Sequence, residues 1–260
     1  MTETPIDQAH SRMASAPEDD ALRLAFFERL ADGELFLLLE GEPDGDNVSP
    51  REIETSEGKF VLAFDREDRL AEFAGKAAPY AALSGRSLSE MLTGVGLGIG
   101  LNIGVAPSEI LIPAEAVAWL KDTLAVRPTE TEATPDKLWP PTGLPDKLVA
   151  ALDTKLVTAA GLAKLAYLSG VTWTGGRRGH LLAFVDAVPG AEPALARAVS
   201  EALVFSGLDA GELDVTFFKA SSPVAARLAK VGLRFDLPTP PEASAPSAPG
   251  LDPDKPPRLR

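Results

Sequence analysis

Serine, histidine and aspartate are the residues of this 260-residue sequence from which a nucleophilic catalytic site would be built. The candidates are Ser84, Ser87, Ser89, Ser108 and His180. None of the serines lies in a Gly-x-Ser-x-Gly motif, which presents a nucleophile on a sharp turn, and His180 is distant from them along the chain. The sequence therefore favours helix-capping serines and a histidine at the start of a strand, and we predict no catalytic residue.

Metal and cofactor patterns are also missing from the sequence. There is no cysteine, and two histidines are too few for a histidine-rich centre. Glu40, Glu42, Asp44 and Asp46 offer hard oxygens, but they lack the Asp-x-Asp-x-Asp-Gly spacing and final glutamate of a calcium loop. The glycine-rich residues 94–101 lack the G-x-G-x-x-G fingerprint, because position 101 is leucine. We therefore predict a solvated acidic loop, no metal site and no cofactor.

The negative charge of the chain is confined to its first half. Residues 1–124 carry 10 basic and 23 acidic side chains, whereas residues 125–260 carry 15 of each, so the first half holds the whole net charge of −13. An acidic chain does not attract nucleic acid or an anionic membrane, and we expect neither as a partner. We predict instead that an unidentified protein binds the acidic module, with Glu42, Asp44 and Asp46 in the partner surface.

Two short basic segments are candidate anion-binding sites. Arg177 and Arg178 occupy a glycine-rich turn close to Trp173, and an arginine fork there would grip a phosphate or stack on a base. Arg86 follows Ser84 at the start of a predicted helix, where an anion would also be favoured. Solvated arginines on a hairpin tip and at a helix start are the simpler interpretation of both segments.

Glycine occupies every even position from 94 to 100, and apolar residues occupy the odd positions. This period of two predicts a strand with one bare backbone face, followed by a turn that contains Asn102 and Gly104. A bare face indicates either a contact surface, which would include Asn102 and Gly104, or close internal packing. Burial of the glycines under Leu88 or Leu120 would favour internal packing.

Composition divides the chain into two α+β modules, each with a mixed sheet, joined by a proline-rich linker. The predicted segments are a disordered N-terminus (1–16), an acidic domain (17–124), a Pro/Thr/Glu linker (125–144), a second domain (145–237) and a disordered Pro/Ala/Ser-rich tail (238–260). No stretch has the pattern of a secretory signal or a membrane span, so we expect a cytoplasmic protein.

The spacing of apolar residues predicts the elements of each module. In the first module, helices begin near Pro17, Asp65, Ser84 and Pro113, and strands lie over residues 34–40, 51–55, 59–64, 79–83, 94–101 and 109–112. In the second module, helices begin near Pro145, Glu192 and Ser222, and strands lie over residues 164–173, 180–188, 212–219 and 233–237.

Four stretches of the first module resemble the SseB family, bacterial proteins named for enhanced serine sensitivity. They are residues 60–75 (FVLAFDREDRLAEFAG), 83–92 (LSGRSLSEML), 98–104 (GIGLNIG) and 108–113 (SEILIP). Ile103 replaces the proline that family members commonly carry between the asparagine and the glycine. The resemblance spans roughly residues 21–124, and the element order of the second module is similar to the C-terminal domain often attached to SseB proteins. It implies an intracellular protein of unestablished activity and supplies no catalytic residue.

Three functional hypotheses follow. The first is a non-enzymatic protein-interaction or regulatory protein that uses the acidic surface. The second is a small-anion or amino-acid sensor, which the family name suggests. The third is a hydrolase or transferase with a site between the modules, where two or more of Arg86, Asn102, Arg178 and His180 would line one deep pocket.

Overall fold

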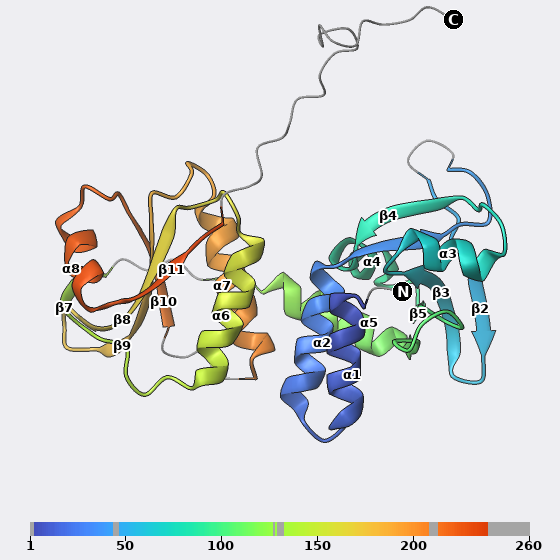
Figure 1. Cartoon of the computed structure of the whole chain (residues 1–260), viewed down its shortest axis with the longest axis horizontal. Helices are drawn as coiled ribbons and strands as arrows, with labels where there is room; N and C mark the ends of the chain where they lie inside the picture. The colour runs from blue at the N-terminus through green and yellow to red at the C-terminus, as the bar shows by residue number, and fades with distance from the viewer. Residues whose placement is uncertain (1–2, 44–46, 127, 129–132, 208–212, 239–260) are drawn as a thin grey trace, which may run out of the picture.

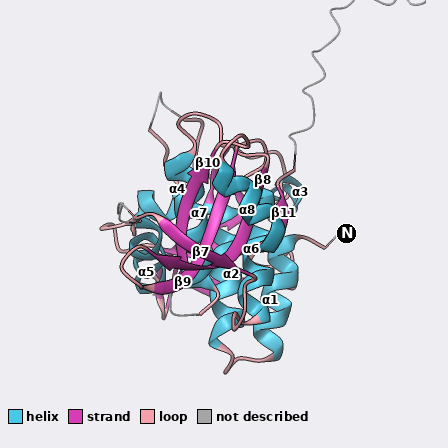
Figure 2. Ribbon diagram, turned by 90° about the vertical axis from the view of Figure 1, so that its left-hand side faces the viewer, coloured by secondary structure: helices cyan, strands magenta, loops and turns pink. Residues whose placement is uncertain are grey.

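The computed structural model of the chain shows two α+β domains that lie side by side, each built on one mixed sheet (Figure 1). It describes residues 3–43, 47–126, 128, 133–207 and 213–238. Helices lie between the two sheets in Figure 1, and Figure 2 views the molecule from the side of the second domain. In the described residues, no helix is long and apolar enough to cross a bilayer.

In its described residues, the first domain combines five helices with six strands. The helices are α1 (Pro5–Ser15), α2 (Asp20–Asp32), α3 (Glu67–Ala74), α4 (Gly85–Leu92) and α5 (Ala114–Ala125). The strands are β1 (Glu34–Leu38), β2 (Glu52–Thr55), β3 (Gly58–Phe64), β4 (Tyr80–Ser84), β5 (Gly98–Leu101) and β6 (Ile110–Ile112). The sheet order is β4-β1-β3-β5-β6, with β2 also paired to β3, and β3 and β5 are parallel.

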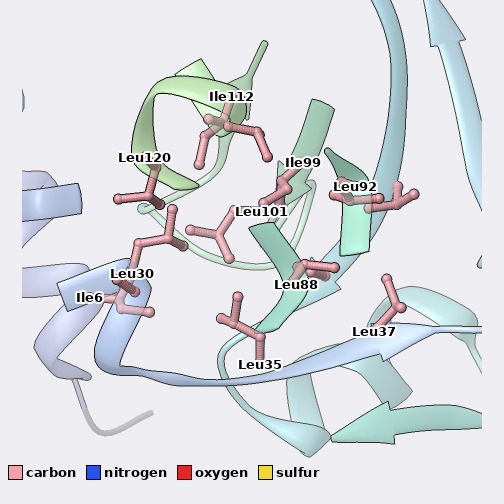
Figure 3. Close-up of a cluster of buried hydrophobic side chains, with 14 of the residues drawn as sticks. Ile6, Leu30, Leu35, Leu37, Leu88, Leu92, Ile99, Leu101, Ile112 and Leu120 are labelled. Carbon is pink, nitrogen blue, oxygen red and sulfur yellow. The ribbon is translucent and has the colours of Figure 1, made fainter. Parts of the chain in front are cut away.

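The main core of the first domain lies between this sheet and four helices (Figure 3). Leu30 of α2, Leu88 of α4 and Leu120 of α5 are fully buried against Leu35 and Leu101 of the strands. A smaller cluster on the other face of the sheet is covered by α3 through Leu70. The spacing of four between apolar residues thus places one face of each helix on the sheet, as expected.

The glycine-rich segment is a strand only in its second half. Gly94 and Gly96 have φ values of +80° and +74°, and Val95 between them is 62% exposed, so residues 94–96 form a turn. Gly98 lies opposite Phe60 in β3, and a Cβ atom there would be 2.5 Å from the Phe60 ring and 2.4 Å from the Ile112 carbonyl oxygen. The bare face is therefore packed internally, by neighbouring strands rather than by Leu88 or Leu120.

The described part of the second domain has three helices and five strands. The helices are α6 (Asp146–Thr158), α7 (Glu192–Phe205) and α8 (Pro223–Val231). The strands are β7 (Pro135–Trp139), β8 (Leu165–Trp173), β9 (Arg178–Val185), β10 (Leu213–Phe218) and β11 (Leu233–Asp236). The sheet order is β10-β9-β8-β11, with β7 also paired to β8, and β9 and β10 are parallel. Helices α6 and α7 cover one face, and α8 covers the other.

Two segments differ from the sequence-based expectation. The N-terminus was expected to be disordered, but residues 5–15 form α1, which begins with a capping box between Thr4 and Asp7 and buries Ile6. The linker was expected over residues 125–144, but residues 135–139 form β7, because Trp139 packs directly over Gly170 of β8. The expected tail lies outside the described residues from position 239 onward.

We predict that Gly98→Ala destabilises the protein by about 1–3 kcal/mol, because the added methyl group would clash with the Ile112 carbonyl oxygen and the Phe60 ring. Urea unfolding followed by circular dichroism measures the change. Gly41→Ala is the matched control, since a Cβ atom at Gly41 meets nothing within 4 Å and should change stability by about 0.5 kcal/mol or less. Equal stability of the Gly98→Ala variant and the wild type would contradict the packing described here.

Candidate functional site at the domain interface

The two domains make direct contact through α2, α5 and α7. Phe205 at the end of α7 is buried in the core of the first domain, and its ring meets Trp119 of α5 edge-on at 6.4 Å. Trp119 in turn meets Phe27 of α2 at 5.3 Å. The domains therefore share apolar contacts, which fixes the position of the neighbouring polar groups.

A buried lysine lies at the same domain interface. Lys155 of α6 has a side chain that is only 4% exposed, and its Nζ donates to Asp32 of α2 at 2.6 Å. The same Nζ is 2.9 Å from Glu201 of α7 and 3.7 Å from Glu28 of α2. A buried ammonium is tolerated only when it is paired, so Lys155 depends on carboxylates from both domains.

Arg86 of α4 completes the group from the first domain. Its two terminal nitrogens donate to the two oxygens of Glu201 at 2.8 and 2.9 Å, which is a bidentate pair. One of them also donates to Asp32 at 3.3 Å. We call Glu28, Asp32, Arg86, Lys155 and Glu201 the interdomain ion cluster. Arg86, predicted as a binding residue, is thus engaged in an ion pair between domains.

Burial and pairing shift the pKa values of the cluster in opposite directions. Burial alone would lower the pKa of Lys155, but Asp32 and Glu201 outweigh it and raise the pKa. Burial alone would raise the pKa of Glu201, but Arg86 and Lys155 outweigh it and lower the pKa. For Glu28, burial outweighs Lys155 and Arg29, so its pKa is raised. Its buried Oε1 atom also has no hydrogen-bond partner, which makes Glu28 the least compensated carboxylate of the cluster.

A crevice of about 200 Å³ opens beside the cluster. Its charged walls are Asp32 and Arg86 from the first domain and Lys155, Arg197 and Glu201 from the second. Small side chains, Ala159, Ala194 and Ala198, line it as well. Charged groups of both signs therefore converge on a space that both domains enclose.

Of the four residues proposed for an enzyme site between the modules, Arg86 alone lines this crevice. Asn102 is fully buried within the first domain, and His180 and Arg178 lie on β9 of the second. Asn102, Arg178 and His180 are therefore absent from the lining of this crevice, so it is not the predicted pocket with two or more of the four residues.

Asn102 belongs to a second buried network, which ties α1 to the sheet. Its amide donates to Ser108 Oγ at 2.9 Å, and its carbonyl accepts from the Asp65 backbone at 3.1 Å. Ser108 donates to Asp7, and Arg69 donates to Asp7 and Asp65 at 2.6–3.0 Å. Because every one of these groups is used inside the fold, Asn102 has a structural role at this turn.

The remaining predicted binding residues lie in separate places. Ser84 caps α4 by accepting from the Ser87 backbone, and the Gly104 backbone donates to Glu109 at 2.8 Å. Arg177 pairs with Asp214 at 2.8 Å and lies over Trp173, whereas the exposed Arg178 lies over Trp139. Glu42 is exposed, and Asp44 and Asp46 lie outside the described residues. Among the described side chains, no group of three or more acidic or histidine residues would hold a metal ion.

Apart from Arg86, sequence reasoning did not single out the charged residues that the domain interface brings together. One signal existed: Lys155 falls on the apolar stripe that α6 presents through Leu148, Leu152 and Leu156. A cation in such a stripe indicates a buried partner of opposite charge. The partner itself cannot be identified from the sequence, because Asp32 is 123 residues away from Lys155.

Comparison with known families gives one match, to the SseB protein N-terminal domain over residues 8–119. The matched region runs from within α1 to within α5 and so spans the first domain. No curated protein and no solved structure matches the chain. The resemblance noted for the first module is confirmed, and that of the second domain to the SseB C-terminal domain stays a prediction.

We predict that Lys155→Met destabilises the protein by about 3–5 kcal/mol, because it leaves Asp32, Glu201 and Glu28 close together without their shared cation. Urea unfolding followed by circular dichroism measures the effect. Lys164→Met removes a lysine that is 77% exposed and paired with Asp186, and it should cost about 0.5 kcal/mol or less. Similar losses in the two variants would show that burial of the pair is unimportant.

Asp7 is predicted to make the first domain sensitive to acid. Burial opposes the charged form of Asp7, but hydrogen bonds from Arg69 and Ser108 outweigh it and hold the pKa well below its usual range. Its contribution is therefore fully present above the unfolded-chain pKa of about 3.9 and is lost as the pH falls below it. At pH 7, Asp7→Asn should cost about 1.5–3 kcal/mol, and this deficit should shrink below about pH 4.

Urea unfolding at pH 7, 5, 4 and 3 tests this dependence. Asp20→Asn is the control, because Asp20 is 74% exposed and forms only a surface pair with Arg23. A deficit of the Asp7→Asn variant that stays constant from pH 7 to pH 3 would contradict the prediction.

Proposed function

We propose that this chain, whose residues 8–119 match the SseB protein N-terminal domain, is a non-enzymatic cytoplasmic protein that binds a basic protein partner through its first domain. The observation that carries the proposal is an excess of exposed carboxylates around β2. We call Glu40, Glu42, Glu52, Glu54 and Glu57 the acidic surface; all five are exposed.

Few cations neutralise this surface. Arg51 approaches Glu40 only to 4.0 Å, and both side chains are 59% exposed, so the pair is weak. Lys59 lies opposite Glu54 in the β2–β3 hairpin and is the other basic residue of the segment. A surface with uncompensated charge of one sign attracts partners of the opposite sign and steers their approach. Asp44 and Asp46, predicted from the sequence, would extend the same charge.

The interdomain ion cluster supports this function indirectly. Because it holds the second domain against α2 and α4, the two domains keep a fixed arrangement when a partner binds the first domain. A protein of this kind acts by bringing surfaces together, and it requires no reactive group.

A second candidate function is sensing of a small anion or an amino acid. The interdomain crevice favours it, because cations and carboxylates of both domains line one open space. A thermal-shift screen against metabolites tests this function, since a ligand that binds only the folded chain raises the melting temperature.

For the partner-binding function, we predict that Glu52→Ala/Glu54→Ala reduces the recovery of bound proteins from a bacterial lysate by about tenfold. Wild-type binding should also fall when the salt concentration rises from 50 to 300 mM, because exposed charges are screened. The variant with alanine at Glu42, Asp44 and Asp46 should lose the same partners.

The control variant is Glu72→Ala/Glu90→Ala, which removes two exposed carboxylates of the same domain from α3 and α4. It should retain the partners. Recovery of the same proteins by all variants, with no dependence on salt, would refute the acidic surface as the binding site.

A further inference from the structure

Arg197 of α7 is a half-buried arginine that lines the interdomain crevice. Within the described part of the chain, its guanidinium has neither an ion-pair partner nor a hydrogen-bond partner, unlike Arg86 and Lys155 beside it. A guanidinium keeps its charge at any physiological pH and offers five donors in a fixed fork. The donors of Arg197 are therefore available to a molecule that enters the crevice.

The reason for the missing partner lies in the cluster itself. Glu201 is one helical turn from Arg197, at the spacing at which opposite charges usually pair. Both oxygens of Glu201 are already taken, one by Arg86 and the other by Arg86 and Lys155. Asp32 is likewise engaged by Arg86 and Lys155. The cluster thus uses the crevice carboxylates without neutralising Arg197.

The surrounding side chains leave space for a ligand at this cation. Ala194 and Ala198 flank Arg197 on α7, and Ala159 follows α6 on the opposite wall. A volume of about 200 Å³ holds several water molecules, and so it also holds a phosphate or a small dicarboxylate. The space beside Arg197 therefore suits a small anion both in size and in charge.

The charges of the crevice walls leave one positive charge in excess: Arg86, Lys155 and Arg197 face Asp32 and Glu201. We infer that the crevice binds a small molecule that carries a phosphate or carboxylate group, with the Arg197 fork as its anchor. This inference rests on the second proposed function, small-anion sensing, and names its site and ligand class. Because the walls come from both domains, the bound anion stabilises their docked arrangement.

Isothermal titration of the full chain with sodium phosphate and, separately, with sodium malonate tests the site at low ionic strength. The wild type should bind at least one of them saturably in the millimolar range, and the preferred anion identifies the group as phosphate or carboxylate. Arg197→Ala should weaken the binding by about tenfold or more, the usual effect of losing a charge-assisted hydrogen bond.

A second variant keeps Arg197 but gives its guanidinium a partner within the protein, so that it can no longer bind an anion. Ala194→Glu places a carboxylate three residues before Arg197 on the same helix, where it supplies an internal counterion. It should abolish anion binding while the variant stays folded, because Ala194 is exposed. Arg23→Ala is the control: it removes an exposed arginine of α2 from outside the crevice and should bind like the wild type.

Two results would overturn the inference. Saturable anion binding that is unchanged in Arg197→Ala and Ala194→Glu would place the site elsewhere and leave the sensing function standing. No saturable binding of either anion would reject the anion site, whereas sensing of an uncharged or cationic metabolite would still be visible in the thermal-shift screen.

Discussion

The ammonium of Lys155 must be compensated by carboxylates that no single domain supplies. Among the described residues of the second domain, only Glu201 reaches it, and Glu201 is already bound by the Arg86 fork. Asp32 and Glu28 of α2 provide the remaining negative charge, so the desolvated ammonium of α6 depends on carboxylates of the docked first domain. These ion pairs therefore join the domains at the interface where Phe205 enters the first core and where the crevice lies. The two compact bodies predicted from the sequence are therefore docked on each other through a shared interface.

Local periodicity predicts most of the elements, because a helix or strand that covers a core shows its buried face in the sequence. The helices α4 and α7 and the hairpin β2–β3 are examples, and the capping role of Ser84 follows from its position before Gly85. The failures share one cause, which is contact between residues far apart in the chain. Helix α1 is anchored by Asp7 to Arg69, 62 residues away, and β7 is positioned by the ring of Trp139 over Gly170. Neither partner can be identified from spacing.

The roles of the candidate site residues likewise depend on partners that are distant in the chain. Arg86 was singled out as an arginine at a helix start, but its partners lie 54 and 115 residues away, and they decide that it joins domains. Asn102 was singled out by its turn, and the turn does require it: its φ is +52°, a conformation that asparagine tolerates, and its side chain joins β5 to Ser108 and Asp65. Arg197 carried no sequence signal, because its distinguishing property is that no side chain in the described part of the folded protein pairs with it.

The acidic surface and the crevice impose opposite electrostatic conditions on their ligands. The chain carries a net charge of −13, all of it from the first half, so its long-range field attracts a basic partner and repels an anion. Added salt screens both effects beyond about 8–10 Å, which weakens the partner complex and reduces the repulsion of an approaching anion. Only short-range donors in a partly desolvated space overcome that repulsion, and Arg197 lies in such a space beside two cations that are already paired. The two proposed functions are thus separated in position, in the sign of the charge that each would recognise and in their dependence on salt.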